Sequence, residues 1–180
     1  MTAALVVYES ILGNTELIAR AVAEGLSGVG PVTLTEVGSA PDTIPSDVAL
    51  LVVGGPTHAF GLSRPETRRD AAAEARGPVP SRGRGLREWL DTLTPTASAL
   101  PTATFDTRVL TPRVPGSAAK KARKRLLHRG FTELAEPESF YVHGKAGPLA
   151  DGEEARATAW GQGLVRRLSE SEHRPQPRSL

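Results

Sequence analysis

The sequence has 180 residues, the size of one compact domain that can bury a sizeable core. It contains no cysteine, which excludes disulfides, thiolate metal sites and cysteine nucleophiles. Its 22 basic and 20 acidic residues give a net charge of only +2, which does not indicate a nucleic-acid-binding protein. No apolar run approaches the roughly 20 residues of a membrane span, and the first residues lack the basic segment of a signal peptide. We therefore expect a soluble cytoplasmic domain with neither nucleic acid nor membrane as a partner.

Two kinds of segment alternate along the chain. Short runs rich in Val, Leu and Ala predict buried strands, and apolar residues at helical spacing predict helices. In chain order, these patterns predict a strand at 3–8, a helix at 15–26 after the cap Asn14, strands at 32–37 and 48–53, helices at 65–75 and 86–93, a strand at 103–109, a helix to His128 after the cap Ser117, an extended lead-in at 131–134, a strand at 139–143 and a helix at 153–168. Residues 76–85 are expected to form a mobile basic loop, and residues 169–180 a disordered tail after a domain of residues 1–168.

Strands that alternate with helices and are continuously apolar predict a parallel sheet covered on both faces. Five such units form a doubly wound, three-layer α/β sandwich with a five-stranded parallel sheet. In sheets of this kind, ligands bind beyond the carboxyl ends of the strands, where the strand order reverses. The loops that begin at Glu9, Gly54, Asp106 and Gly144 are therefore expected to meet at one edge of the sheet.

The loop after the first strand has the features of an anion site. It runs Glu9-Ser10-Ile11-Leu12-Gly13-Asn14-Thr15, between a buried strand and an amphipathic helix. Its backbone N–H groups and the positive end of the helix dipole can bind phosphate, and the side chains of Ser10, Asn14 and Thr15 can add hydrogen bonds. The loop contains no Lys or Arg, so a phosphate would be held by neutral donors. It is neither a P-loop nor a Gly-x-Gly-x-x-Gly fingerprint, and an ordinary capped turn is the alternative interpretation.

The loop after the third strand suits a flat ring. Its glycines and proline predict a specific, exposed backbone path that presents Thr57, His58, Ala59 and Phe60 at the carboxyl edge of the sheet. Considered alone, His58 is more typical of a loop histidine that caps a carbonyl than of a catalytic group. Phe60 could equally cover a gap in the core. The sequence shows no acid–base pair and no nucleophile arrangement, so no catalytic side chain and no metal ligands are predicted.

These loops resemble those of flavodoxins. Ser10-Ile11-Leu12-Gly13-Asn14-Thr15-Glu16 resembles the phosphate-binding loop of that family, and Gly54-Gly55-Pro56-Thr57 resembles the segment that enters its ring-contacting loop. Phe105-Asp106-Thr107-Arg108 is similar to the third flavin loop of bacterial flavodoxin-domain proteins, including the actinobacterial type. The resemblance covers all five strand–helix units. It implies the flavodoxin-like sheet order 2-1-3-4-5 and flavin mononucleotide (FMN) as the cofactor.

The resemblance assigns three groups of cofactor-binding residues by position. It implies that the phosphate is bound by Ser10, Ile11, Leu12, Gly13, Asn14 and Thr15. It implies that the isoalloxazine ring lies against Pro56, Thr57, His58, Ala59, Phe60 and Gly61, with Asp106, Thr107 and Arg108 on the other side. Two features depart from the family: Leu12 stands where a hydroxyl residue is usual, and the loops lack the Trp or Tyr that typically sandwich the ring.

The function implied by the resemblance is electron transfer by bound FMN. Flavodoxins that carry electrons are usually acidic, whereas this chain has a cationic helix around Lys120–Arg129 and a basic loop with Arg82 and Arg84. That helix is either a solvated face or a docking surface for a redox partner protein with an acidic surface. An NAD(P)H-dependent FMN or quinone reductase, or a flavodoxin-like binding module that has lost its flavin, are the alternatives. A phosphotransfer receiver is disfavoured, because no carboxylate ends the third strand.

Overall fold

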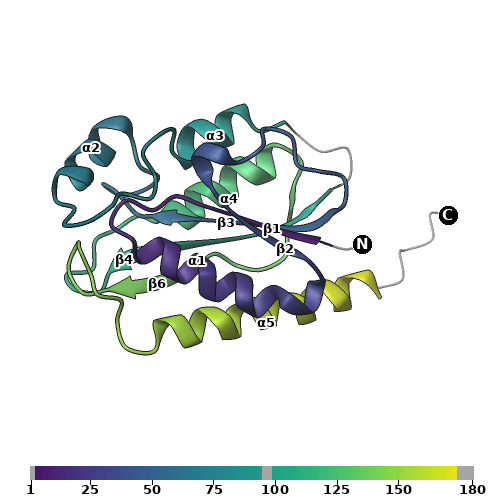
Figure 1. Cartoon of the computed structure of the whole chain (residues 1–180). Helices are drawn as coiled ribbons and strands as arrows, with labels where there is room; N and C mark the ends of the chain where they lie inside the picture. Colours follow the sequence, from purple (N-terminus) through teal and green to yellow (C-terminus); the bar gives the residue numbers. More distant parts are fainter. Residues whose placement is uncertain (1–2, 95–98, 174–180) are drawn as a thin grey trace.

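The computed structural model describes residues 3–94 and 99–173 (Figure 1). The strands within these residues are β1 (Ala3–Tyr8), β2 (Val32–Glu36), β3 (Val48–Pro56), β4 (Pro101–Val109), β5 (Thr132–Glu133) and β6 (Glu138–Val142). The helices are α1 (Asn14–Gly25), α2 (Pro65–Ala73), α3 (Leu86–Thr92), α4 (Ala118–His128) and α5 (Glu153–Glu172). Short 3₁₀ turns follow α1 at Leu26–Val29 and β2 at Val37–Ser39.

The strands form one parallel sheet in the order β2-β1-β3-β4-β5, which confirms the predicted order. The predicted count of five strands is wrong by one, because β5 and β6 share the fifth position and both pair with β4. β5 pairs with Pro101 and Thr102 at the start of β4, and β6 pairs with its second half. Pro137 lies between the two segments, where its missing N–H prevents one continuous ladder.

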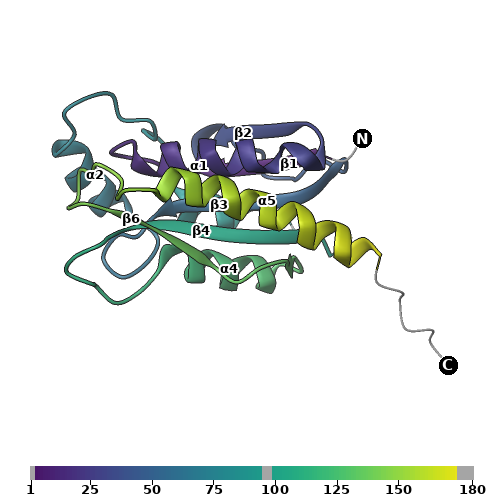
Figure 2. The ribbon, with the colours of Figure 1, turned by 90° about the horizontal axis from the view of Figure 1, so that it is seen from below.

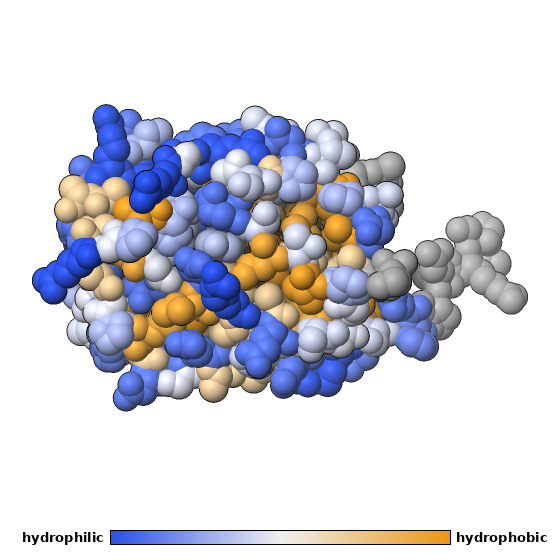
Figure 3. Space-filling model, viewed as in Figure 1, coloured by the Kyte–Doolittle hydropathy of each residue, from blue (hydrophilic) through white to orange (hydrophobic). Residues whose placement is uncertain are grey.

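Helices cover both faces of the sheet (Figures 1 and 2). α1 and α5 lie on one face, where Ile18, Val22 and Leu164 pack with strand residues in one core cluster. α3 and α4 lie on the other face, where Trp89 and Leu126 belong to a second cluster. Apolar side chains reach the surface along the α1–α5 face, interrupted by hydrophilic ones (Figure 3). α2 buries no residue and lies beyond the carboxyl ends of the strands (Figure 1).

Close contact between α1 and α5 depends on two glycines. A Cβ atom at Gly25 would lie 2.2 Å from the carbonyl oxygen of Thr158, and one at Gly161 would lie 2.6 Å from that of Val22. Both distances are far below van der Waals contact, so neither position has room for a side chain. The two helix backbones therefore touch at this crossing.

Two segments in which flavin-binding loops were expected to begin, at Gly54 and Asp106, are still parts of strands. β3 continues through Pro56, and β4 includes Asp106 to Arg108, so the residues predicted as a third flavin loop lie in the ladder. Asp106 pairs with Gly55 on one side and with Ser139 on the other. The strand predicted at 103–109 is therefore confirmed, and the residues that resemble a flavin loop lie inside it, because β6 pairs with β4 as far as Val109.

Two helix ends also differ from expectation. The N-cap of α1 is Gly13, with a left-handed φ of 92°, so the prediction of Asn14 as the cap is wrong. The Asn14 amide instead donates to the carbonyl oxygen of Ala146 at 3.2 Å. α5 continues to Glu172, four residues past the expected end, so residues 169–172 of the predicted tail are helical. Residues 174–180 of that prediction lie outside the described residues.

Candidate functional site

A pocket of about 350 Å³ lies at the carboxyl edge of the sheet. Its volume is in the range of small-molecule sites. It is formed by the β1–α1 loop, the turn after β3, the end of β4, one side of α2 and the segment after β6. Of the predicted site residues, those that line it are Ile11, Leu12, Asn14, Thr15, Pro56, Thr57, His58, Ala59, Phe60, Thr107 and Arg108. Ser10, Gly13, Gly61 and Asp106 do not line it.

The β1–α1 loop carries a run of free backbone donors. Among the described residues, nothing accepts a hydrogen bond from the N–H groups of residues 11–15, whereas the next N–H, of Glu16, donates to Ser10 Oγ at 3.2 Å. The first N–H groups of a helix have no acceptor within the helix, and its dipole places partial positive charge at the same end. The loop therefore offers an anion several donors at the wall of the pocket.

The start of this loop is held by the segment between α2 and α3. Ser10 N–H donates to Ser81 Oγ at 2.9 Å, and Ser81 N–H donates back to the Ser10 carbonyl oxygen at 2.8 Å. Both residues are buried. The basic segment 76–85, which contains no helix or strand, is thus bonded to the β1–α1 loop at Ser81. The buried Ser10 hydroxyl closes the loop and does not reach the pocket.

Two further contacts join the β1–α1 loop to other walls of the pocket. Thr15 Oγ1 and Thr107 Oγ1 are 2.7 Å apart and buried, which links α1 to β4. The Asn14 amide links the same loop to the segment after β6 through Ala146, and a Cβ atom at Gly147 would lie 2.7 Å from Asn14 Oδ1. The predicted phosphate-binding side chains therefore also hold the pocket together.

The turn after β3 has an unusual backbone. His58 and Gly61 pair with each other through two hydrogen bonds of 2.8 and 3.0 Å. The two residues between them, Ala59 and Phe60, have φ values of 42° and 75°. Positive φ at both central residues is typical of a type I′ turn and is costly for residues with a side chain. The strained turn holds the Phe60 ring outward at the pocket, where it is 57% exposed.

His58 is half-buried beside the start of α2. Its Nδ1 lies 3.3 Å from Thr67 Oγ1. Burial, and secondarily the positive charge of Arg68, lower the pKa of His58. A histidine with a lowered pKa is neutral at pH 7, so His58 adds hydrogen-bonding capacity to the pocket without adding charge.

Asp106 acts behind the pocket wall. Its carboxylate is fully buried and accepts four hydrogen bonds: Oδ2 from Thr57 Oγ1 (3.0 Å), Ser117 Oγ (2.5 Å) and Ala119 N–H (3.1 Å), and Oδ1 from Ser139 Oγ (2.7 Å). Ser117 caps α4, as predicted. Asp106 therefore connects β4, β6, the start of α4 and the first residue of the β3–α2 turn. Asp106 thus positions Thr57 and does not itself line the pocket, which corrects its expected location in a flavin loop.

Several residues that line the pocket were not predicted. α2 contributes Thr67, Asp70, Ala71 and Glu74, and the segment after β6 contributes Gly144 and Lys145. Lys145 Nζ lies 3.2 Å from Glu74 Oε1, so an exposed ion pair joins the two segments. Arg108 also lines the pocket and donates to the Val114 carbonyl oxygen at 2.5 Å. The pocket is therefore lined by two cations, Arg108 and Lys145, and by two carboxylates, Asp70 and Glu74, so its side-chain charges balance.

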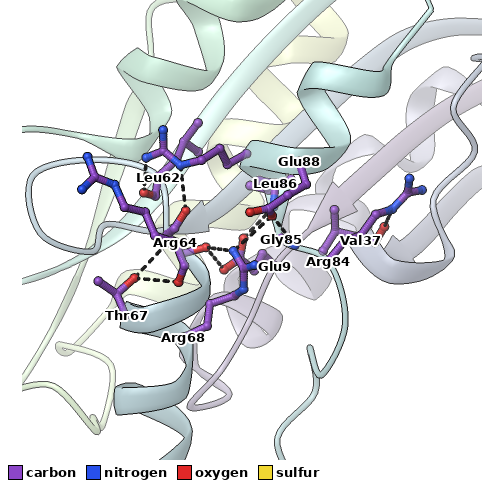
Figure 4. A network of polar contacts seen from close by, with 12 residues as sticks. Glu9, Val37, Leu62, Arg64, Thr67, Arg68, Arg84, Gly85, Leu86 and Glu88 are labelled. Atoms are coloured by element: carbon purple, nitrogen blue, oxygen red, sulfur yellow. Dashed lines mark hydrogen bonds and ion pairs between the residues drawn. The ribbon is translucent and has the colours of Figure 1, made fainter.

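Glu9 has partners that the sequence did not suggest (Figure 4). Its buried carboxylate accepts hydrogen bonds from Ser63 Oγ and from Leu86 N–H, the latter at 2.7 Å. Arg68 donates to Ser63 Oγ at 3.0 Å and forms an ion pair with Glu88 at 3.1 Å. Burial raises the pKa of Glu9 more than these bonds lower it. The network fixes the end of β1 against the starts of α2 and α3, and it does not line the pocket.

The residues present fit an FMN-sized ligand with a phosphate. The run of free N–H groups suits an anion, and the His58–Gly61 turn, with Ala59 and Phe60, and Val109 at the end of β4 offer apolar contacts for a ring. Within residues 3–94 and 99–173 no cluster of three His, Asp or Glu side chains could hold a metal ion. Over the same residues, no helix is long and apolar enough to cross a membrane.

The same fold occurs in known flavodoxins. No protein-family model and no curated protein matches this sequence. Flavodoxin 1 from Bacillus cereus has 17% identity and a TM-score of 0.65, with 91% of this chain and 97% of that chain covered. Flavodoxin 2 from the same organism has 16% identity and a TM-score of 0.63, with 94% and 99% covered. An archaeal flavodoxin has 15% identity and a TM-score of 0.61, with 93% and 99% covered. At these identities the likeness establishes the flavodoxin-like α/β fold.

Proposed function

We propose that this protein binds FMN at the carboxyl edge of its sheet and acts in electron transfer in the cytoplasm. The observation that carries the proposal is the run of unpaired N–H groups at residues 11–15, in a loop that lines the pocket. The first N–H groups of a helix need a side-chain cap, water or an anion as acceptor, and the N-cap of α1 provides no side-chain acceptor. A phosphate supplies such an acceptor.

Each wall of the pocket has a distinct role in this proposal. The N–H groups of residues 11–15 would hold the phosphate at the positive end of the α1 dipole. The ring would lie between the His58–Gly61 turn and the end of β4, with Phe60 at its exposed edge. When bound, FMN supplies the redox chemistry, and the protein supplies orientation and electrostatics.

An electron carrier needs a redox partner that reaches the flavin edge. We propose a partner protein that approaches at Phe60, since this ring is 57% exposed and borders the pocket. Among the described residues, the walls of the pocket hold no acid–base pair or nucleophile for a hydrolytic step. The single ionisable group with a lowered pKa there, His58, is neutral.

The test is FMN uptake by variants that fill the pocket. Ala71 lines the pocket from α2, so Ala71→Trp should abolish FMN binding, whereas Ala73→Trp on the exposed side of the same helix should leave it intact. Binding is measured by quenching of flavin fluorescence, and folding by circular dichroism. Equal FMN binding by both variants would contradict the assignment of the pocket. Absence of FMN binding by the wild-type protein would contradict the function itself.

A further inference from the structure

A second cavity lies next to the flavin pocket, on the α3–α4 side of the molecule. This groove has a volume of about 630 Å³ and shares Ala59 and Phe60 with the pocket. Six arginine and lysine side chains line it against one carboxylate, that of Asp91. Like charges gathered in one groove repel one another, so the free protein is destabilised by them unless an anion binds there.

The floor of the groove holds guanidinium groups in fixed positions. Arg87 donates to the carbonyl oxygens of Ser63 and Leu62 at 3.0 and 2.7 Å, and Arg129 donates to those of Leu90 and Asp91 at 2.5 and 2.6 Å. These acceptors are neutral, so they orient the guanidinium groups without cancelling their charge. Burial, followed by the positive charges of Arg125 and Arg64, lowers the pKa of Arg87. The cations are thus preorganised and only partly neutralised.

The rim adds flexible cations and an aromatic ring. Lys121 and Lys124 are exposed, and neither forms an ion pair within the described residues. The ring of Phe60, which is exposed, also lines the groove and offers an apolar surface. Fixed arginines suit phosphate oxygens, and an exposed aromatic ring suits the face of a base.

We propose that this groove binds a nucleotide carrying a diphosphate, with its phosphates toward Arg87, Lys121 and Lys124 and its base at Phe60. A concave site with preorganised arginines beside an aromatic ring matches this chemistry better than an acidic protein surface, which would meet the exposed lysines more readily than the half-buried guanidinium groups of Arg87 and Arg129. The site goes beyond the proposed function and shares only Ala59 and Phe60 with the pocket.

The experiment measures ADP binding by calorimetry to the full-length protein freed of flavin, at low salt. ADP should bind, more weakly as salt is raised, and the variant Lys121→Glu/Lys124→Glu should lower its affinity by at least about tenfold. The control Arg166→Glu/Arg167→Glu makes the same charge change on exposed residues of α5, across the sheet, and should alter the affinity by less than about twofold. Circular dichroism establishes that both variants are folded.

Further arms identify the occupant and the location. Saturating FMN should leave ADP binding in place; loss of ADP binding would put the nucleotide in the flavin pocket and overturn the proposal. Pyrophosphate should bind more weakly than ADP, and equal affinity would refute the role given to Phe60. No ADP binding by the wild-type protein, or an equal loss in both charge variants, would also overturn the proposal. Because these titrations use flavin-free protein, their failure and a failure to bind FMN are separate results.

Discussion

Removal of the Asp106 carboxylate should destabilise the protein and open the flavin pocket together. The side chain is fully buried and accepts four hydrogen bonds, from Thr57, Ser117, Ser139 and the N–H of Ala119. Asp106→Ala would leave these donors buried without an acceptor. At about 1 kcal/mol for each, the loss amounts to about 4 kcal/mol.

Asp106→Asn tests the same reasoning more gently. An asparagine oxygen in place of Oδ2 keeps three of the bonds, and the Ser139 hydroxyl can accept from the new NH₂ group. Only the charge assistance is lost, so we expect a destabilisation of about 1–2 kcal/mol. Asp47→Ala, at an exposed turn position, is the matched control and should cost less than about 0.5 kcal/mol.

Urea unfolding followed by circular dichroism measures these differences. With a slope of about 2 kcal/mol/M, the Ala variant should unfold at a urea concentration about 2 M lower than the wild type. FMN affinity should fall in the same order, because Thr57 loses the contact that fixes the start of the ring-contacting turn. Equal midpoints for the Ala and Asn variants, or a loss below about 1 kcal/mol for Ala, would refute the positioning role.

Two further predictions concern stability and pH. Gly161→Ala should lower the free energy of unfolding by about 1–3 kcal/mol, measured by thermal or urea unfolding, because its Cβ would overlap the backbone of α1. In the control Gly163→Ala, the new Cβ meets only the end of the Arg166 side chain at 3.7 Å, so this variant should stabilise the protein by about 0.5–1 kcal/mol. An unchanged stability of Gly161→Ala would contradict the tight helix crossing. Burial raises the pKa of Glu9, so Glu9 holds its proton more tightly in the folded protein than in the unfolded chain. The stability that protonated Glu9 contributes is therefore present below pH 4.5 and is lost as the pH rises through the pKa of the folded state. Urea unfolding between pH 4 and 8 should therefore show the wild type losing stability relative to Glu9→Gln as the pH rises, with Glu24→Gln as an exposed control; a parallel pH profile for Glu9→Gln and the wild type would refute the cost of burying this charge.

The fold was predictable because its signals are local. Continuous apolar runs such as that of β3 and the helical spacing of Ile18 and Val22 in α1 each identify an element without reference to the rest of the chain. Alternation of the two kinds of element then specifies a parallel sheet and the edge at which ligands bind. The division of the last strand at Pro137, by contrast, required knowledge of how that strand pairs.

Much of the site was not predictable, because its residues depend on tertiary contacts. Aspartate is a residue type common in loops, and only the four hydrogen-bond partners of Asp106, from three other segments, show that its carboxylate is buried and links those segments. The contribution of α2 to the pocket wall follows from how this polar helix lies over the sheet edge. Lys145 could have been found, since the segment after Gly144 was expected at that edge.

The central claim is that the N–H groups of residues 11–15 hold the phosphate of FMN. A titration of the flavin-free protein with FMN and with riboflavin, which lacks the phosphate, tests this claim most directly. FMN should bind one to one and at least about tenfold more tightly than riboflavin, because hydrogen bonds to a charged acceptor contribute about 1.5–3 kcal/mol. Equal affinity for the two flavins, or binding of neither, would contradict the account.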